Sequence, residues 1–439
     1  MSYFKPVSIS LSPNVEKDDV KLALNLIIRP WLWTRQKRSA HFDGQAPGNA
    51  IEELERQFRE YLGVKYAISF NSGRSALYAI LRALGGEPTF AEGSGEAKKV
   101  LMQAFTCNAS INPVLWAKMM PEYVDCAIST FNIDIEDLKT KVRENPNAKI
   151  LMVQHTFGQP ANMAEILKIC QENNLILIED CAHALGAKYN GQLVGTFGKA
   201  SFFSFSRDKV ISSVYGGMAV TNDDRLGQAL RQAQGKFGMP NLCWTWQQIW
   251  HPILLHFFIL PIYNFLDLGK IFLVLSQWTH VLSKAVHWKE KRGLKPNYFP
   301  KALPNALAVM AQNQFKKQEK FYNHRKKLFE YYNENLKNTA FILPKSEPNA
   351  EPSYLRYTVK HKDAHDIIYD AWHKQNILLG DWYTTPIAPF DTKLEEMHYK
   401  MGMCENAEKL AKKTLNLPTH INISIKDAER IVNFLKKYA

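Results

Sequence analysis

The chain has 439 residues, of which 46% are hydrophobic and 22% are charged, and its formal net charge is +13 at pH 7. It is long enough for one large domain and a smaller one around a substantial apolar core. The positive charge favours anionic partners, from nucleotides and phosphates to acidic lipid surfaces or nucleic acid. The six cysteines lack the Cys-x-x-Cys spacing of a zinc site, so we expect reduced thiols, with neither a metal site nor a disulfide framework.

Residues 1–48 are interpreted as an N-terminal arm. They lack the continuous apolar core of a signal peptide, so we expect a cytoplasmic protein. "NAIEELERQFREYLG" (49–63) then shows apolar residues at helical spacing and ends at a glycine. The strand-like "KYAISF" (65–70) leads through a tight turn into the helical "SGRSALYAILRALG". The predicted order is strand, turn, helix.

Three later segments repeat this alternation: "KVLMQAFTCNASINPVLWA", "AKILMVQHTFGQPANMAEILKICQENN" and "LILIEDCAHALGA". Such repetition predicts an α/β domain with a parallel sheet and crossover helices. After about residue 300 the pattern becomes helix-rich and then mixed, which predicts a smaller α+β domain. We place the large domain at residues 49–242 and the C-terminal small domain at residues 297–439.

Polar residues stand where the predicted strands end, which is where open α/β folds carry their chemistry. Ser72, Gly73, Arg74 and Ser75 fall in the turn before a helix, where free N–H groups and the helix dipole favour an anion. A helix start that is merely well capped explains the same turn.

Asp180 ends the apolar run "LILIED", so its buried carboxylate would need a cation or a strong donor, and a protonated pyridine nitrogen is such a partner. Lys209 follows a second apolar run that is rich in serine, and an interior lysine can attack an aldehyde as an amine. Ser204 and Ser206 precede it and could reach the same phosphate as Ser75. Together, an anion cradle, a buried acid and a lysine would hold pyridoxal 5′-phosphate (PLP).

Each of these residues also has an ordinary structural interpretation. Asp180 could cap a helix, Lys209 could be an exposed loop lysine, and Ser204 could be a satisfied core serine. The cofactor interpretation depends on all of them fitting one ligand.

The string "IEDCAHALGAKYNGQLVGTFGKASFFSFSRDK" and the following "YGGMAVTND" resemble the acid-bearing and lysine-bearing motifs of the DegT/StrS family of PLP-dependent nucleotide-sugar aminotransferases. "SGRSALYAILRALG" and "AFTCNASINPVLWA" resemble two further family segments, and the order is that of the family. The resemblance covers most of residues 49–235 and 298–439. It implies a fold type I PLP-dependent transferase with a large parallel or mixed-sheet domain and a smaller C-terminal α+β domain. It also implies a homodimer, because this family builds its sites between subunits.

The resemblance assigns roles by position. Lys209 matches the catalytic lysine that forms a Schiff base with PLP, Asp180 matches the partner of the pyridine nitrogen, and His183 matches the side chain beside the phenolic oxygen. Gly73, Arg74 and Ser204 fall on phosphate-contacting positions, and Arg74 replaces a usual threonine. Cys107 stands where the family often has an aromatic residue over the ring, so the stacking partner stays open.

The implied function is transfer of an amino group from an amino acid, by resemblance glutamate, to a keto sugar on a nucleotide or a lipid-phosphate carrier. The alternatives are a PLP-dependent transferase or dehydratase on a non-sugar substrate and a non-catalytic regulator with the PLP fold. The presence of Lys209 and Asp180 counts against the regulator. Nucleic acid is not an expected partner, because the basic residues are scattered and no binding motif is present.

Residues 243–296 form an apolar, aromatic insertion that ends in a basic cluster. Its uncharged run "IWHPILLHFFILPIYNFL" reaches the ~18 residues that a spanning helix needs. A single span would separate residues 298–439 from the cofactor motifs, which leaves a hairpin, an in-plane interfacial pair or a soluble arm. Pro252 and Pro261 disfavour a deep span, whereas flanking aromatic and basic residues suit the headgroup zone. We expect residues 243–295 to contact the inner face of the cytoplasmic membrane, with a dimer arm or lid as the alternative.

Overall fold

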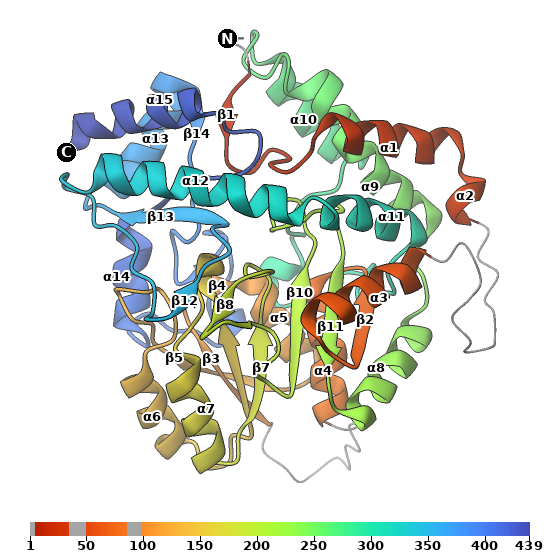
Figure 1. The fold of residues 1–439 in the computed structure, drawn as a ribbon, viewed down its shortest axis with the longest axis vertical. Coiled ribbons are helices and arrows are strands. Elements are labelled where there is room, and N and C mark those ends of the chain that lie inside the picture. Colours follow the sequence, from red (N-terminus) through yellow and green to blue (C-terminus); the bar gives the residue numbers. More distant parts are fainter. Residues whose placement is uncertain (1–4, 35–49, 86–97) are drawn as a thin grey trace.

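The computed structural model describes residues 5–34, 50–85 and 98–439. A seven-stranded sheet with the strand order β2-β11-β10-β7-β6-β3-β5 forms its centre (Figure 1). Only β11 runs antiparallel to its neighbours in this sheet. The strands, in sheet order, are β2 (Tyr66–Phe70), β11 (Gly217–Thr221), β10 (Ala200–Ser204), β7 (Ile176–Asp180), β6 (Ile150–Gln154), β3 (Lys99–Gln103) and β5 (Met120–Val124). The expected α/β fold with a parallel or mixed sheet is confirmed.

Helices cover both faces of the sheet because side chains alternate along each strand. The helices of this domain are α3 (Ala50–Leu62), α4 (Gly73–Gly85), α5 (Asn108–Trp116), α6 (Ile135–Glu144), α7 (Met163–Glu172) and α8 (Asp224–Phe237). Val100 and Ile150 pack with α4 and α5 on one face, whereas Leu101 and Leu151 pack with α6 and α7 on the other. The loops after the parallel strands open at one edge of the sheet, which positions the site described below.

The C-terminal part builds a second core around an antiparallel pair of strands. Its elements are α12 (Gln318–Leu336), β13 (Arg356–Lys360), α13 (Ala364–Gln375), β16 (Thr414–Pro418) and α15 (Ile425–Leu435). β1 (Val7–Ser8) pairs with β14 (Ile377–Leu378), so the N-terminal segment is joined to this core. α11 (Asn305–Phe315) instead packs with α3 in the large core, and α14 (Glu405–Lys413) packs against the sheet domain. The domain limits suggested by the sequence stay a prediction.

The remaining elements are short or belong to the N-terminal arm. They are α1 (Lys17–Ile28), α2 (Trp31–Thr34), β4 (Thr106–Cys107), β8 (Lys188–Tyr189), β9 (Gln192–Leu193), β12 (Ala350–Glu351), β15 (Ile387–Ala388), η1 (Thr156–Gly158), η4 (Glu395–Met397) and η5 (Lys436–Tyr438). Residues 1–4 and 35–48 of the predicted arm lie outside the described part of the chain.

The insertion consists of two halves with different surroundings. α9 (Leu242–Leu254) packs against α1 and α11, and its Trp244, Ile249 and Ile253 belong to the large core. η2 (Leu255–Ile259, a π-helix) follows α9 and packs with α10 (Leu268–Trp278), both coloured green in Figure 1, and η3 (Glu290–Arg292) comes after them. Among helices within the described ranges, none is both long and apolar enough to cross a membrane.

Candidate active site

One cavity of 190 Å³ brings together most of the residues that the sequence singled out. Its lining includes eight of them, namely Gly73, Arg74, Cys107, Asp180, His183, Ser204, Ser206 and Lys209. Ser75 is buried outside this lining, where its hydroxyl donates to Asn71 Oδ1 at 2.7 Å. Residues separated by more than one hundred positions therefore meet where β2, β7 and β10 end.

Asp180 sits at the end of β7 and is 3% exposed. Its Oδ2 accepts from Ser110 Oγ at 2.7 Å and its Oδ1 accepts from the Ala182 amide at 3.0 Å. Burial raises the pKa of Asp180, and these two donors with the nearby Lys209 only partly offset it. A buried carboxylate in this state gains from a further cationic or N–H partner inside the cavity.

Lys209 faces the same cavity from the loop after β10. Burial lowers the pKa of its ammonium, and Arg356 lowers it further, whereas Asp208, Cys107 and Asp180 act in the opposite direction. Its Nζ lies 4.4 Å from the centre of the Trp382 ring. A lowered pKa increases the neutral fraction of the amine, which is the nucleophilic form.

Trp382 is an aromatic residue of the cavity lining that contacts two of the predicted cofactor residues, Lys209 and His183. Its ring lies 4.9 Å from the His183 ring with 16° between the planes, and the Arg356 guanidinium carbon lies 3.3 Å from the Trp382 ring centre. His183 Nδ1 accepts from the Phe157 amide at 3.2 Å. Burial, Lys209 and Arg356 hold the pKa of His183 well below its usual value, so the ring is neutral and its Nε2 carries the proton.

The start of α4 and the end of β10 form a tight polar corner. A Cβ on Gly73 would lie 3.1 Å from Ser204 Cβ, and one on Gly217 would lie 2.4 Å from the Ser72 backbone, so larger residues would close the approach. Ser204 Oγ and Ser206 Oγ lie 3.1 Å apart. Two hydroxyls and a helix N-terminus thus face one point, an arrangement suited to an anion.

Arg74 has a partner that the sequence did not suggest. It forms a buried ion pair with Glu290 of the insertion, and its guanidinium carbon lies 4.4 Å from the Phe299 ring centre. Glu290 is held in turn, because its carboxylate accepts from the His287 amide at 2.9 Å and its carbonyl accepts from Asn112 Nδ2 at 3.0 Å. The pair brings no net charge to the cavity, so in the predicted phosphate contact the charge of the Arg74 guanidinium would already be balanced by Glu290.

The end of the insertion forms one wall of the cavity, through Ala285 and Val286. Two contacts fix this wall. Arg207 Nη2 donates to the Ser283 carbonyl at 2.6 Å, and the Tyr215 hydroxyl donates to the Lys284 carbonyl at 2.8 Å. The insertion is therefore part of the site's structure.

Behind Asp180, three buried residues with metal-ligating atoms lie within 4.8 Å of one another, namely His155, Glu179 and Cys181. Glu179 already accepts from the amides of Gly195, Phe197 and Gly198 at 2.7, 2.8 and 2.7 Å. His155 lies 3.2 Å from Glu179 and accepts from the Ala161 amide at 3.1 Å. These bonds explain the cluster as a hydrogen-bonded support under β7.

Comparison with known proteins connects this geometry to a family. The profile of the DegT/DnrJ/EryC1/StrS aminotransferase family matches residues 38–265 and 276–436. The chain belongs to this family. The predicted resemblance is confirmed, and enzymes of this family use PLP.

Individual relatives carry informative names. GDP-perosamine synthase of Caulobacter vibrioides is 36% identical over 207 residues, which is 47% of this chain and 52% of that protein. The chain spans about half the length of such curated relatives. UDP-N-acetyl-3-dehydro-alpha-D-glucosamine 3-aminotransferase of Acidithiobacillus ferrooxidans is 26% identical over 391 residues, or 89% of each protein. The PLP form of a putative sugar aminotransferase from Streptococcus pneumoniae shares the fold, with a TM-score of 0.68 at 18% identity over 99% of this chain and 97% of that one.

The residues in the cavity fit PLP. The buried Asp180 carboxylate with its raised pKa suits a protonated ring nitrogen, Lys209 offers an amine, and the corner of Gly73 and Ser204 suits a phosphate. Sequence reasoning missed Ser110, Trp382, Arg356 and Glu290. Ser110 could have been suspected from its place at a helix start, but nothing local distinguishes Trp382 or Glu290, which reach the site only through the fold.

Proposed function

We propose that the protein is an aminotransferase that moves an amino group from an amino acid, glutamate by family resemblance, to a keto sugar carried on a nucleotide. The supporting observation is the shared cavity of Lys209, with its lowered pKa, and the buried Asp180. Perosamine synthase and the 3-aminotransferase bear names of GDP- and UDP-linked sugars, which supports a nucleotide carrier here.

The residues that would hold PLP are Lys209, Asp180, His183, Gly73 and Ser204. When bound, PLP supplies an aldehyde and an electron-withdrawing ring that stabilises negative charge at the carbon bearing the amino group. Asp180, oriented by Ser110 and the Ala182 amide, would hold a proton at the ring nitrogen. His183 would orient the ring by donating from Nε2–H to its phenolic oxygen, since His183 Nδ1 already accepts from the Phe157 amide. Lys209 Nζ would hold the aldehyde carbon, and once the amino donor has displaced it, the freed amine would take up and return the proton at the substrate carbon.

The test is to incubate the purified protein with nitrogen-15 glutamate and a panel of GDP- and UDP-linked keto sugars, and to follow the label by mass spectrometry. We expect labelled amino sugar from at least one nucleotide sugar and none from the Lys209→Ala variant. Equal labelling by that variant, or labelling of non-sugar keto acids alone, contradicts the proposal.

Two properties of the assembly belong to the same proposal. A homodimer is supported by family resemblance and by Phe390, an aromatic residue that lines the cavity and yet is 80% exposed. Light scattering of the purified protein tests it, and a monomer at micromolar concentration contradicts it.

Contact with the inner face of the cytoplasmic membrane is supported by the outer half of the insertion. Its exposed side chains include Phe257, Phe258, Leu266, Leu275 and Trp278, at 51%, 52%, 79%, 49% and 77% of their free area. We call residues 255–281 with these side chains the apolar surface. Such a surface is a hazard in water unless lipid or protein covers it. It would also favour a lipid-phosphate carrier as an alternative to the nucleotide, and the same labelling assay with a lipid-linked keto sugar tests that alternative.

A further inference from the structure

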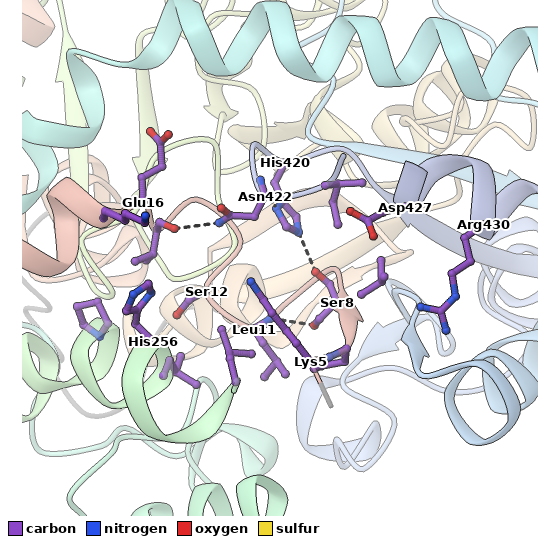
Figure 2. Close-up of a pocket in the computed structure, with 18 residues that line it drawn as sticks. Lys5, Ser8, Leu11, Ser12, Glu16, His256, His420, Asn422, Asp427 and Arg430 are labelled. Carbon is purple, nitrogen blue, oxygen red and sulfur yellow. Dashed lines mark hydrogen bonds between the residues drawn. The ribbon is translucent and has the colours of Figure 1, made fainter. Parts of the chain in front are cut away.

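A second cavity, of 390 Å³, lies between the N-terminal segment, η2 and the start of α15 (Figure 2). His256 on η2 and Arg430 on α15 stand on opposite sides of it, and Lys5 lies between them (Figure 2). None of the residues that line it lines the PLP cavity. The chemistry proposed above makes no use of it.

The walls of this cavity are held by specific hydrogen bonds. His420 Nε2 donates to the Ser8 carbonyl at 2.7 Å, and Asn422 Nδ2 donates to the carbonyls of Pro13 and Val15, each at 2.9 Å. Burial lowers the pKa of His420 to about 3, so this imidazole stays neutral at physiological pH and serves as a fixed donor. The N-terminal segment is therefore tied to the C-terminal domain in one arrangement.

Two lysines that line the cavity have no acidic partner among the described residues. Within the described chain, Lys5 and Lys17 form no ion pair, and both help burial to lower the pKa of His256. The lining holds two acidic residues, of which Glu16 pairs with Lys320 at 2.6 Å and Asp427 accepts from the Ser424 amide at 2.9 Å as a helix cap. A third cation of the lining, Arg430, donates to the Gln375 carbonyl, so the cations outnumber the acids. The positive charge of the two unpaired lysines favours binding of an anion in this cavity.

A third feature is an unsatisfied donor. Ser12 lines the cavity, is 6% exposed, and its hydroxyl has no hydrogen-bond partner among the described residues. Buried polar groups are normally paired, so this hydroxyl is available to a ligand oxygen. Beside it, Leu11, Leu255 and Leu260 give the cavity an apolar side. Leu255 belongs to η2, the helix from which Phe257 and Phe258 project to the exterior.

We propose that this cavity binds the phosphate group of a membrane lipid, with Lys5, Lys17 and Ser12 contacting the phosphate and the acyl chains running along the apolar surface. The inference rests on the proposed membrane contact and names its ligand. An anionic headgroup complements the two open lysines, and the apolar side of the cavity continues into residues that already face the exterior. A free phosphate would use only the polar half of this site.

The experiment uses the full-length protein and soluble dihexanoyl phosphatidic acid in titration calorimetry, with inorganic phosphate as a separate arm. Replacing both lysines (Lys5→Gln with Lys17→Gln) should weaken lipid binding by about tenfold or more. The matched control is Lys149→Gln with Lys168→Gln, two exposed lysines near β6 and on α7, at the opposite end of the molecule from α10, which should change binding less than about twofold (Figure 1). Both variants should retain aminotransferase activity, which verifies their folding.

The outcomes separate the two proposals. No binding of the short-chain lipid, equal loss in both lysine pairs, or inorganic phosphate binding as tightly as the lipid overturns the lipid-phosphate site. Vesicle flotation is measured in parallel. If vesicles bind but the Lys5 and Lys17 variant binds equally well, the membrane contact stands and the cavity assignment falls. If the short-chain lipid binds with the expected lysine dependence but vesicles do not, the cavity assignment stands and the membrane contact falls.

Discussion

The PLP cavity and the apolar surface of the insertion depart from ordinary burial in opposite directions. In the cavity, charged groups are hidden from water, with Asp180 at 3% and Arg74 at 7% exposure. On the apolar surface, Leu266 and Trp278 are 79% and 77% exposed. Burying a charge and exposing a large apolar side chain both cost free energy. A bound ion would lower the cost in the cavity, and contact with apolar groups would lower it on the apolar surface. The first suits an ionic cofactor and the second suits an apolar environment.

The two regions are also physically connected. α9 contributes Trp244 and Ile249 to the large core, while Glu290 and Ser283 fix the wall of the cavity. Replacing the whole insertion by a short loop would therefore remove core packing and part of the active site at once. Only point variants change one region without the other.

The largest effect should come from Lys209→Ala, which removes the amine from the cavity. We expect activity to fall by about a thousandfold or more, because among the described residues of the lining no other lysine is present. In the unchanged protein, borohydride reduction followed by peptide mass spectrometry should find the cofactor on Lys209. A labelled peptide elsewhere contradicts the assignment. Lys284→Ala, which changes an exposed neighbour of the wall, serves as the control and should keep most activity.

The link between the regions is tested by Glu290→Ala. This change leaves the Arg74 guanidinium buried without its carboxylate, and we expect the free energy of unfolding in urea to fall by about 3 kcal/mol. The control is Asp391→Ala, which breaks the far more exposed pair with Lys291 and should cost about 1 kcal/mol or less. If both variants lose the same small amount, the insertion is not anchored through Arg74.

Asp180→Asn tests the cavity without removing the amine. The amide cannot hold the ring nitrogen protonated as a carboxylate does, so we expect turnover to fall about a hundredfold while PLP remains bound. Ser110→Ala removes only one of the two hydrogen bonds to Asp180 and should cost about tenfold at most. Cofactor content by absorbance and turnover by product formation are measured on the same samples. A near-normal rate for Asp180→Asn would contradict a role in catalysis and leave Asp180 a purely structural residue.

A four-residue variant tests the apolar surface without disturbing α9. We expect it to lower vesicle affinity in flotation by more than about tenfold, because the exposed apolar area is lost, with turnover on soluble substrate retained. Its substitutions are Phe257→Ser, Leu266→Ser, Leu275→Ser and Trp278→Ser. A matched control changes four exposed apolar residues elsewhere, namely Ile128→Ser, Leu167→Ser, Ile342→Ser and Met401→Ser. Equal loss in the two variants means that the insertion has no special role at the membrane.

The smallest effect concerns pH. Asp180 raises the pKa of Lys209, which burial has lowered, so Asp180→Asn should shift the pKa of Lys209 further down. The neutral amine then forms at lower pH, and the pH profile for uptake of PLP by the apoprotein should move in that direction. Ser204→Ala, which changes no charge near the amine, should leave the midpoint in place. A shift to higher pH contradicts the electrostatic coupling.

The local sequence already determined the α/β class, the strand–turn–helix units and most of the cavity. Asp180, Ser204 and Gly73 could be placed because each follows or ends an apolar strand, and parallel strands bring such ends to one edge. Lys209 could be singled out in the same way, since it follows a second apolar run, and the family motifs added its role and His183.

The tertiary structure alone decided which partners these residues meet. Arg74 pairs with Glu290, 216 positions away, and His183 stacks on Trp382, although neither partner has a local pattern that points to the site. The sequence could not predict that α9 is buried and α10 is exposed, since both helices are rich in apolar residues. Periodicity reports which side chains share a face of an element, but only packing against distant elements determines whether that face is covered.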